Sequence, residues 1–453
     1  MKIRLKTGLA ILMAALLCVL STGCSFRFTV SPDELYSPPQ MPSQYKELKN
    51  RIEALRKDGA EYASPVSGSN VQTVQMVDLD GDGKEEALVF LRNSEKSDSL
   101  AIYIFKAKGS TYKQMAVIRG TGTAIYSIAY SDLNQDGFLE LLIGWKTGTD
   151  LQSLSVYSLR GEKPHELLHI AAYVRYAIAD LNQDKLQELV VLHADNDGGQ
   201  ADYYTWNHSG NLSLHSSAPV SMTMAELSNM GRVRSGTLNT GRPALFVTGV
   251  SVSSTAITDI LVDKSGELAN IALSDTTGVS KENYRSLSLF PTDINGDGYT
   301  EVPAPTVLPT RAKTMTDMCY QINWQNYDEA GNKKTVESTC HDSEDGWYLV
   351  LPKTWDGKIA ATRGASGMDE MAVTLSAMQD SQLTDFLRIY TITGENREAK
   401  AVSGNRFVLS RQSGTIYAAE FLAGNETWKY GLSTERLRSM FNLITTEWQA
   451  GDN

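Results

Sequence analysis

The sequence has 453 residues, of which 42% are hydrophobic and 21% charged, so the chain can bury a large core and lacks the composition of a disordered protein. Its formal net charge is −11, with 53 acidic and 42 basic residues. This balance argues against a nucleic-acid-binding protein, because such proteins neutralise phosphates with a basic surface. No nucleic acid is therefore expected among its partners.

Residues 1–23 have the pattern of a signal peptide. Basic residues precede an apolar run over 9–20 that is too short to span a bilayer comfortably. The segment that follows, LSTGCS, resembles the lipobox of bacterial lipoproteins, although Leu20 stands four residues before Cys24 instead of the usual three. The resemblance implies that Cys24 carries lipid and anchors the mature chain to the extracytoplasmic face of the cell membrane. The alternative is a plain signal peptide with an incidental cysteine.

Two segments separate this signal from the main domain. Residues 24–43 are rich in Pro and Ser, which predicts a tether between membrane and domain. In residues 44–58, apolar side chains recur at helical spacing, which predicts a short amphipathic helix that packs against the domain.

From about residue 66 the sequence shows an internal repeat. Short apolar runs rich in β-branched and aromatic residues alternate with turn residues, which is typical of strands. Four strings align without gaps: VDLDGDGKEEALVFL from 77, SDLNQDGFLELLIGW from 131, ADLNQDKLQELVVLH from 179 and TDINGDGYTEVPAPT from 292. Midway through the longest gap, GTLNTGRPALFVTG keeps the hydrophobic frame but has lost the acids. Five consecutive units of roughly 50 residues are therefore indicated.

Each unit holds about four strands, which is typical of a propeller blade. The predicted fold is all-β, a β-propeller of about seven four-stranded blades over residues 66–453. Calcium-loop repeats would occupy about 66–305 and two degenerate blades about 306–430. The two degenerate blades are inferred only from the length of this region and from its strand-like residue pattern. Apolar spacing also predicts a C-terminal helix over about 434–448.

The acidic loops have the residue types of a calcium site. Oxygen ligands alternate at positions one, three and five, a glycine permits the turn at position six, the carbonyl of position seven can coordinate, and a glutamate stands at position nine. The predicted ligands are Asp78, Asp80, Asp82, Lys84 and Glu86 in the first loop; Asp132, Asn134, Asp136, Phe138 and Glu140 in the second; Asp180, Asn182, Asp184, Leu186 and Glu188 in the third; and Asp293, Asn295, Asp297, Tyr299 and Glu301 in the fourth.

The loop pattern DxDxDGxxE resembles the calcium loops of FG-GAP and VCBS repeats, known from integrin α-subunit propellers. The resemblance implies a propeller with Ca²⁺ as a structural cofactor at the blade edges. An EF-hand is excluded because no loop has an acid at position twelve. The third loop should be the weakest, since Lys185 replaces the glycine. The alternative is that Asp, Asn and Gly form ordinary turns here without metal.

A second metal motif, HELLH, occupies residues 165–169. On a helix, His165 and His169 would share a face and Glu166 would activate a zinc-bound water. The repeat frame predicts a strand instead, on which the histidines would lie about 13 Å apart at roughly 3.3 Å per residue. A zinc site is therefore only a minor alternative.

Two cysteines remain in the predicted mature domain. Cys319 and Cys340 flank a segment with the pattern of a hairpin, and an exported domain permits a disulfide between them. The alternative is two buried free thiols.

These features predict a surface-anchored calcium-binding β-propeller lipoprotein that serves as a binding or scaffold module. Its ligand is expected to be a protein or a glycan outside the cell or in the envelope. The resemblance extends to VCBS-repeat lipoproteins of Gram-positive bacteria and implies no reaction, and no catalytic residue is predicted. The alternative is an extracellular hydrolase or polysaccharide lyase on a propeller, which would need paired carboxylates beyond the calcium loops.

Overall fold

The computed structural model describes most of the chain from residue 45 to residue 444. The described ranges are 45–93, 100–109, 111–120, 122–149, 151–195, 198–274, 276–280, 283–311, 314, 317–379 and 382–444. The predicted signal peptide (1–23), Cys24 and the tether (24–43) lie outside these ranges and stay predictions. Within the described ranges, no helix combines the length and the apolar character needed to cross a membrane.

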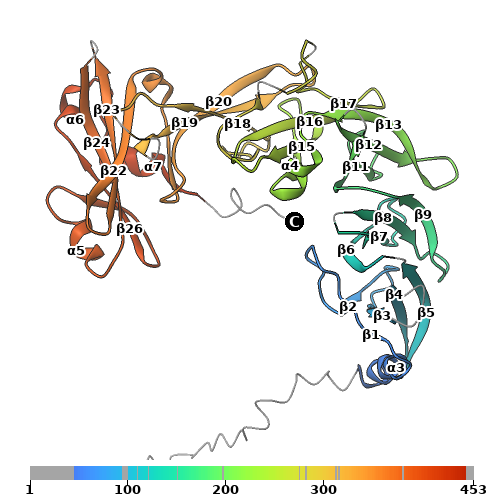
Figure 1. Cartoon of the computed structure of the whole chain (residues 1–453). Coiled ribbons are helices and arrows are strands. Elements are labelled where there is room, and N and C mark those ends of the chain that lie inside the picture. The colour runs from blue at the N-terminus through green and yellow to red at the C-terminus, as the bar shows by residue number, and fades with distance from the viewer. Residues whose placement is uncertain are drawn as a thin grey trace, which may run out of the picture.

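The predicted N-terminal helix is confirmed as α3, Lys46–Lys57. Leu48 and Ile52 lie one turn apart, and each is 1% exposed because both pack on the first sheet beside Val89. Figure 1 shows α3 at the start of the described chain, next to that sheet. The first sheet has one apolar face with no preceding sheet beside it, and the helix covers that face.

Four antiparallel sheets follow the helix, and their consecutive strands pair side by side. In the first sheet, β1 and β2 both pair with β3. Its strands are β1 (Glu61–Tyr62), β2 (Val74–Val77), β3 (Glu86–Arg92), β4 (Leu100–Lys108) and β5 (Thr111–Gly120). The second sheet contains β6 (Ala124–Ser131), β7 (Glu140–Lys146), β8 (Gln152–Ser158) and β9 (His165–Ile170). The third contains β10 (Arg175–Ala179), β11 (Glu188–Asp195), β12 (Gly198–Trp206) and β13 (Leu212–Val220), and the fourth contains β14 (Arg232–Thr237), β15 (Pro243–Val250), β16 (Ala256–Lys264) and β17 (Glu267–Asn270).

Two five-stranded sheets complete the described chain. In order of pairing, the fifth contains β18 (Val302–Val307), β19 (Tyr320–Tyr327), β20 (Lys333–Asp342), β21 (Trp347–Val350) and β27 (Phe441–Leu443). The sixth contains β22 (Ile359–Gly367), β23 (Glu370–Gln379), β24 (Gln382–Ile392), β26 (Thr415–Phe421) and β25 (Phe407–Gln412). Short helices connect the strands: α4 (Met224–Asn229), η4 (Lys353–Trp355), α5 (Arg397–Ala401), α6 (Gly424–Thr427) and α7 (Thr434–Met440).

The described residues thus form six sheets, where about seven blades were expected. The cysteine hairpin is not a separate blade, because its strands β19 and β20 extend the sheet that β18 begins directly after the fourth acidic loop. The fifth sheet therefore has about the length of the earlier repeats, and the remaining residues supply one further sheet instead of two. Among the described residues, no strand pair joins the sixth sheet to the first.

The predicted C-terminal helix is shorter than expected. α7 ends at Met440, and Phe441–Leu443 form β27, which pairs with β21. The ring of Phe441 stacks on Trp347 with 5.7 Å between centroids. Packing against the fifth sheet therefore overrides the helical spacing of these apolar residues. Residues 445–448 of the predicted helix lie outside the described ranges.

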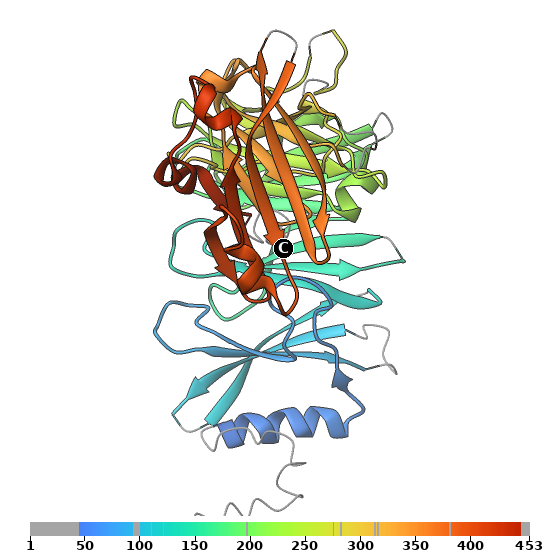
Figure 2. The same cartoon turned by 90° about the vertical axis from the view of Figure 1, so that its left-hand side faces the viewer.

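Consecutive sheets pack their apolar faces on one another. Figure 2 shows the first sheets stacked one above the next. Each of four buried clusters takes side chains from two neighbouring sheets: Ile104 with Ile143, Leu154 with Val191, Val190 with Val247, and Phe246 with Val302. The core is therefore divided into layers between the sheets, as in a stack of blades.

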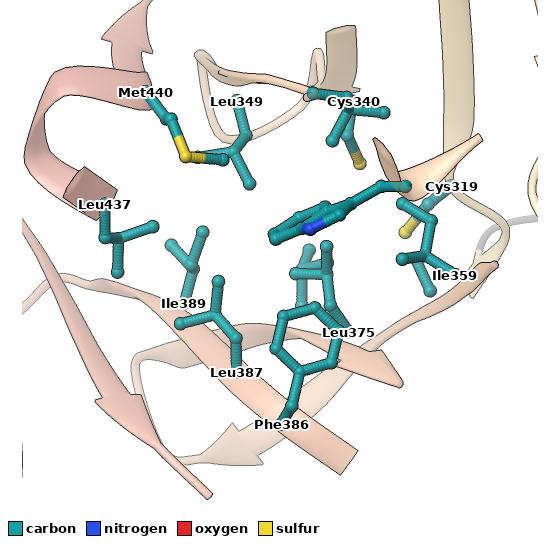
Figure 3. Close-up of a cluster of buried hydrophobic side chains, with 14 of the residues drawn as sticks. Cys319, Cys340, Leu349, Ile359, Leu375, Phe386, Leu387, Ile389, Leu437 and Met440 are labelled. Carbon is teal, nitrogen blue, oxygen red and sulfur yellow. The ribbon is translucent and has the colours of Figure 1, made fainter. Parts of the chain in front are cut away.

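The largest cluster lies between the fifth and sixth sheets. Its centre is aromatic: the ring of Phe386 lies 4.6 Å from Trp428 and 5.2 Å from Trp355, measured between centroids. Figure 3 shows Phe386 among the aliphatic side chains of this cluster.

The two cysteines lie in the same cluster as free thiols, so the predicted disulfide is not formed in the structure. Cys340 pairs in register with Gln321, two residues beyond Cys319. Both thiols face the apolar interior in Figure 3, and burial raises the pKa of each above its usual range. They act as small core residues.

Candidate metal sites in the acidic loops

Each acidic loop closes a tight antiparallel hairpin. The first three loops join β2 to β3, β6 to β7 and β10 to β11, and the fourth precedes β18. In every case the residue before the first aspartate pairs with the glutamate at position nine: Val77 with Glu86, Ser131 with Glu140, Ala179 with Glu188, and Thr292 with Glu301. Strand pairing therefore holds both ends of each loop.

The aspartate at position one is fixed by the turn itself. Its Oδ2 accepts a hydrogen bond from the backbone N–H of position six in all four loops. The donors are Gly83 at 2.9 Å, Gly137 at 3.0 Å, Lys185 at 3.0 Å and Gly298 at 2.8 Å. The carboxylates Asp78, Asp132, Asp180 and Asp293 are thus turned toward the loop interior.

Hydrogen bonds within each turn also link positions three, five and seven. The side-chain oxygen of position three accepts from the N–H of position five, and Oδ1 of position five accepts from the N–H of position seven. The first contacts join Asp80 to Asp82, Asn134 to Asp136, Asn182 to Asp184 and Asn295 to Asp297. The second join Asp82 to Lys84, Asp136 to Phe138, Asp184 to Leu186 and Asp297 to Tyr299.

The glutamate at position nine ties the end of each loop to its beginning. One carboxylate oxygen, Oε2, accepts the backbone N–H of position two, which belongs to a buried aliphatic residue. These bonds are Leu79 to Glu86 (3.0 Å), Leu133 to Glu140 (3.0 Å), Leu181 to Glu188 (2.9 Å) and Ile294 to Glu301 (3.2 Å). All four glutamates are at most 1% exposed.

The second oxygen of three of these glutamates has no hydrogen-bond partner. Oε1 of Glu86, Glu140 and Glu301 is buried without one, as is Oδ1 of Asp78 and Asp180. Burial raises the pKa of Glu140 and Glu301 to about 7 and raises that of Glu86. A buried carboxylate oxygen without a donor is costly, and a bound cation is one partner that could compensate this cost. The all-oxygen donor set therefore fits a hard cation such as Ca²⁺.

The third loop converges as well as the first. Carboxylate oxygens of Asp180, Asp184 and Glu188, at positions one, five and nine, lie within 4.8 Å of one another. In the first loop those of Asp78, Asp80 and Glu86, at positions one, three and nine, do so. Burial again raises the pKa of Glu188 to about 7, although the hydroxyl of Tyr203 lies beside this carboxylate. The replacement of glycine by Lys185 has not dispersed the acids.

The effect of Lys185 lies instead in the backbone conformation at position six. Position six has φ between +80° and +86° in all four loops, a region that favours glycine, and Lys185 occupies it at +80°. The other three loops place Gly83, Gly137 and Gly298 there. The third loop is therefore strained where the sequence departs from the repeat.

Two basic side chains that the sequence pattern did not reveal lie beside the acidic loops. Lys106 of β4 places its ammonium against Asp80, 3.2 Å from Oδ2 of Asp82 and 3.8 Å from Oε1 of Glu86, and its hydrogen bond to Asp80 raises its pKa. Arg160 contacts Asp136 at 3.2 Å from a more exposed position. Lys106 directly follows Phe105, which pairs with Ala87 beside Glu86, so strand register was the missing information.

Successive loops also hydrogen-bond to each other across the sheets. The N–H of position eight in one loop donates to a carbonyl at the start of the preceding loop: Leu139 to Leu79 (2.8 Å), Gln187 to Leu133 (2.7 Å) and Thr300 to Thr237 (2.9 Å). Thr237 belongs to the unit that has lost its acids, which therefore keeps this connection. These bonds link the first loop to the second, the second to the third, and the unit near Gly236 to the fourth, along one edge of the stacked sheets. Among the described residues, no such bond joins the third loop to the unit near Gly236.

The zincin-like segment is a strand, as the repeat frame predicted. His165 and His169 lie in β9, where His165 contacts Asn211 and His169 contacts Ser155. Glu166 Oε1 lies 3.6 Å from His169, but the described residues contain no cluster of three potential metal ligands here. The helical geometry that the motif requires is absent from these residues.

The fold and the loops together define a mostly β protein of propeller-like antiparallel sheets with acidic loops at the first hairpin of a sheet. The sequence profile of the FG-GAP-like repeat family matches residues 78–143, which run from the first loop into the strand after the second. No curated protein matches the chain in sequence.

Two solved structures show a weak overall likeness. The periplasmic gluconolactonase of Pseudomonas aeruginosa is 11% identical, with a TM-score of 0.29, over 72% of this chain and 93% of that one. A protein from Lactobacillus plantarum is 11% identical, with a TM-score of 0.24, over 73% of this chain and 97% of that one. Neither likeness bears on the activity of this chain.

The strained backbone of the third loop leads to a stability prediction. Lys185→Gly should raise the free energy of unfolding by about 1 kcal/mol, because it relieves the left-handed conformation. The backbone hydrogen bond from position six to Asp180 would remain. Urea unfolding followed by circular dichroism measures this change.

The matched control is the reverse exchange in the first loop. No heavy atom lies within 4 Å of the place that a Cβ on Gly83 would take, so Gly83→Lys should cost about the same amount through conformation alone. Two variants that both unfold like the parent would contradict the role assigned to position six.

Proposed function

We propose that this chain is an exported lipoprotein whose four acidic loops bind Ca²⁺ and whose propeller-like body serves as a binding or scaffold module at the membrane surface. The observation that carries the calcium proposal is the buried Oε1 of Glu140 and Glu301, which has no hydrogen-bond partner. Oε1 of Glu86 also has no hydrogen-bond partner, although the Lys106 ammonium approaches it at 3.8 Å. Each lies within a loop whose other oxygens are already aimed inward by backbone hydrogen bonds. A cation completes that arrangement, and an ordinary turn leaves it unsatisfied.

The residues that would hold Ca²⁺ are those at positions one, three, five, seven and nine of each loop. Ca²⁺ bound there would neutralise carboxylates that otherwise repel one another. The loops connect successive sheets through backbone hydrogen bonds, so the metal would also stiffen the edge along which the sheets meet. Lys106 supplies part of this neutralisation in the first loop, and its ammonium would have to move aside for an ion to reach Asp80 and Asp82. This role is structural, and the binding of partners belongs to another surface.

Calcium removal gives the direct test of this role. The melting temperature should fall by several degrees when EDTA replaces millimolar Ca²⁺, because an ion that binds only the folded chain stabilises it by mass action. Differential scanning calorimetry of the same sample under both conditions measures the shift.

A single-loop variant sharpens that test. Glu301→Gln keeps an acceptor for the N–H of Ile294 but removes one charged ligand, so the calcium-dependent shift should shrink without vanishing. The exposed Glu398→Gln, in α5, is the control and should leave the shift unchanged. Identical melting curves in Ca²⁺ and EDTA for the parent chain would refute the calcium proposal.

The anchor is supported by the sequence pattern at Cys24 alone. Cys24→Ser should move the protein from the detergent phase to the aqueous phase in a detergent partition experiment, because it removes the only residue that the lipobox-like segment offers for lipidation. A parent chain that already partitions into the aqueous phase would show that the segment is not used.

A further inference from the structure

A cavity of about 300 Å³ lies where the first four sheets come together. It is formed by the segment 67–69 ahead of β2 and by the innermost strands β6, β10 and β14 or the residues just before them. Figure 1 shows β2 and β6 on the inner side of the curve that the sheets follow, with β5 and β9 on its outer side. Its volume is at the lower end of the range for small-molecule sites.

The cavity is near the ends of the strands opposite to the acidic loops. Arg175 is the first residue of β10, and Asp180 follows the last residue of the same strand. Arg232 is likewise the first residue of β14 and pairs with Thr248, as Arg175 pairs with Leu192. Two successive sheets therefore present an arginine at the same structural position, on the side away from the carboxylates of the loops.

The charge of the cavity lining is the reverse of that of the whole chain. Among the described residues that line it, Arg175 and Arg232 are the charged ones and none is an aspartate or glutamate, although acids outnumber bases by 53 to 42 in the sequence. Among the described residues, no carboxylate lies within ion-pair distance of Arg175. Within the described part of the chain, the hydrogen bond of its guanidinium is to the carbonyl of Ser228, at 3.5 Å, which leaves several N–H donors for a ligand.

The remaining lining suits the body of a small molecule. The guanidinium of Arg232 is held 3.8 Å from the ring centre of Phe290, which fixes its direction. The rings of Tyr173 and Tyr176 lie 5.9 Å apart, and serine hydroxyls complete the wall. Planar guanidinium groups recognise a carboxylate through paired, charge-assisted hydrogen bonds.

We propose that this cavity binds a small organic carboxylate, whose charged end meets Arg175 and Arg232 and whose body lies against the tyrosines. This inference rests on the proposed binding role and gives it a ligand class. It places recognition on the inner side of the curve that the sheets follow, at a site separate from the acidic loops.

The test is calorimetric titration of the full chain in detergent, at low salt and with saturating Ca²⁺. The probes are benzoate and D-glucuronate, each with its neutral counterpart, benzamide or D-glucose, together with inorganic phosphate. At least one carboxylate should bind, and its neutral counterpart and phosphate should bind at least tenfold more weakly. Arg175→Gln should weaken carboxylate binding at least tenfold, and Arg232→Lys, which keeps the charge but loses the planar fork, should weaken it less.

Arg411→Gln, at an exposed position near the end of β25, is the matched control and should bind like the parent. Equal binding by phosphate, equal binding by the neutral probes, absence of binding by both carboxylates, or unchanged binding by Arg175→Gln would each overturn the inference. The calcium-dependent melting shift is measured on the same samples. A shift without carboxylate binding would reject the cavity inference and leave the calcium proposal standing, whereas a missing shift would reject the calcium proposal by itself.

Discussion

The buried glutamate at position nine of each acidic loop is the interaction on which the rest of the arrangement depends. One of its oxygens accepts the N–H of position two, so the end of the loop is held against its start. This bond also fixes where the second strand begins, because the glutamate is the first residue of β3, β7 and β11. The other oxygen is left inside the protein without a hydrogen-bond partner in three of the four loops, although in the first loop the Lys106 ammonium lies 3.8 Å from it. A bound structural ion would give this buried carboxylate oxygen a partner.

The loops are also the places where one sheet contacts the next through its backbone. Hydrogen bonds from position eight to the preceding loop run along one edge of the stack, while apolar clusters fill the space between the sheet faces. The unit near Gly236 lacks the acids but still accepts such a bond at Thr237. Loss of a metal site in one repeat is therefore compatible with the fold. The cavity near Arg175 lies away from this edge, which separates the site proposed for ligand recognition from the sites that hold the sheets.

The sequence predicted local features better than long-range ones. The alignment of the four loops located the hairpins that carry them, and helical spacing located α3, because both depend on neighbouring residues. The cysteine hairpin was assigned to the first of the two degenerate blades, together with the strands that follow it, because the residue pattern of a strand does not show that β18 pairs with β19. For the same reason Phe441 was placed in a helix, although it pairs with Leu349 as a strand. Lys106 was missed because its approach to Glu86 requires the register between β3 and β4.

The central claim is that the loops are ion sites and not merely turns, and counting bound ions tests it most directly. Native mass spectrometry of the chain, exchanged into volatile buffer with Ca²⁺, should show up to four calcium ions per chain. The fourth ion to bind should have the lowest affinity. Glu140→Gln should lower the maximum by one, since it changes a single buried ligand. A parent chain that carries no calcium at millimolar concentration would contradict the account, because its buried glutamate oxygens would then have to be stabilised in another way.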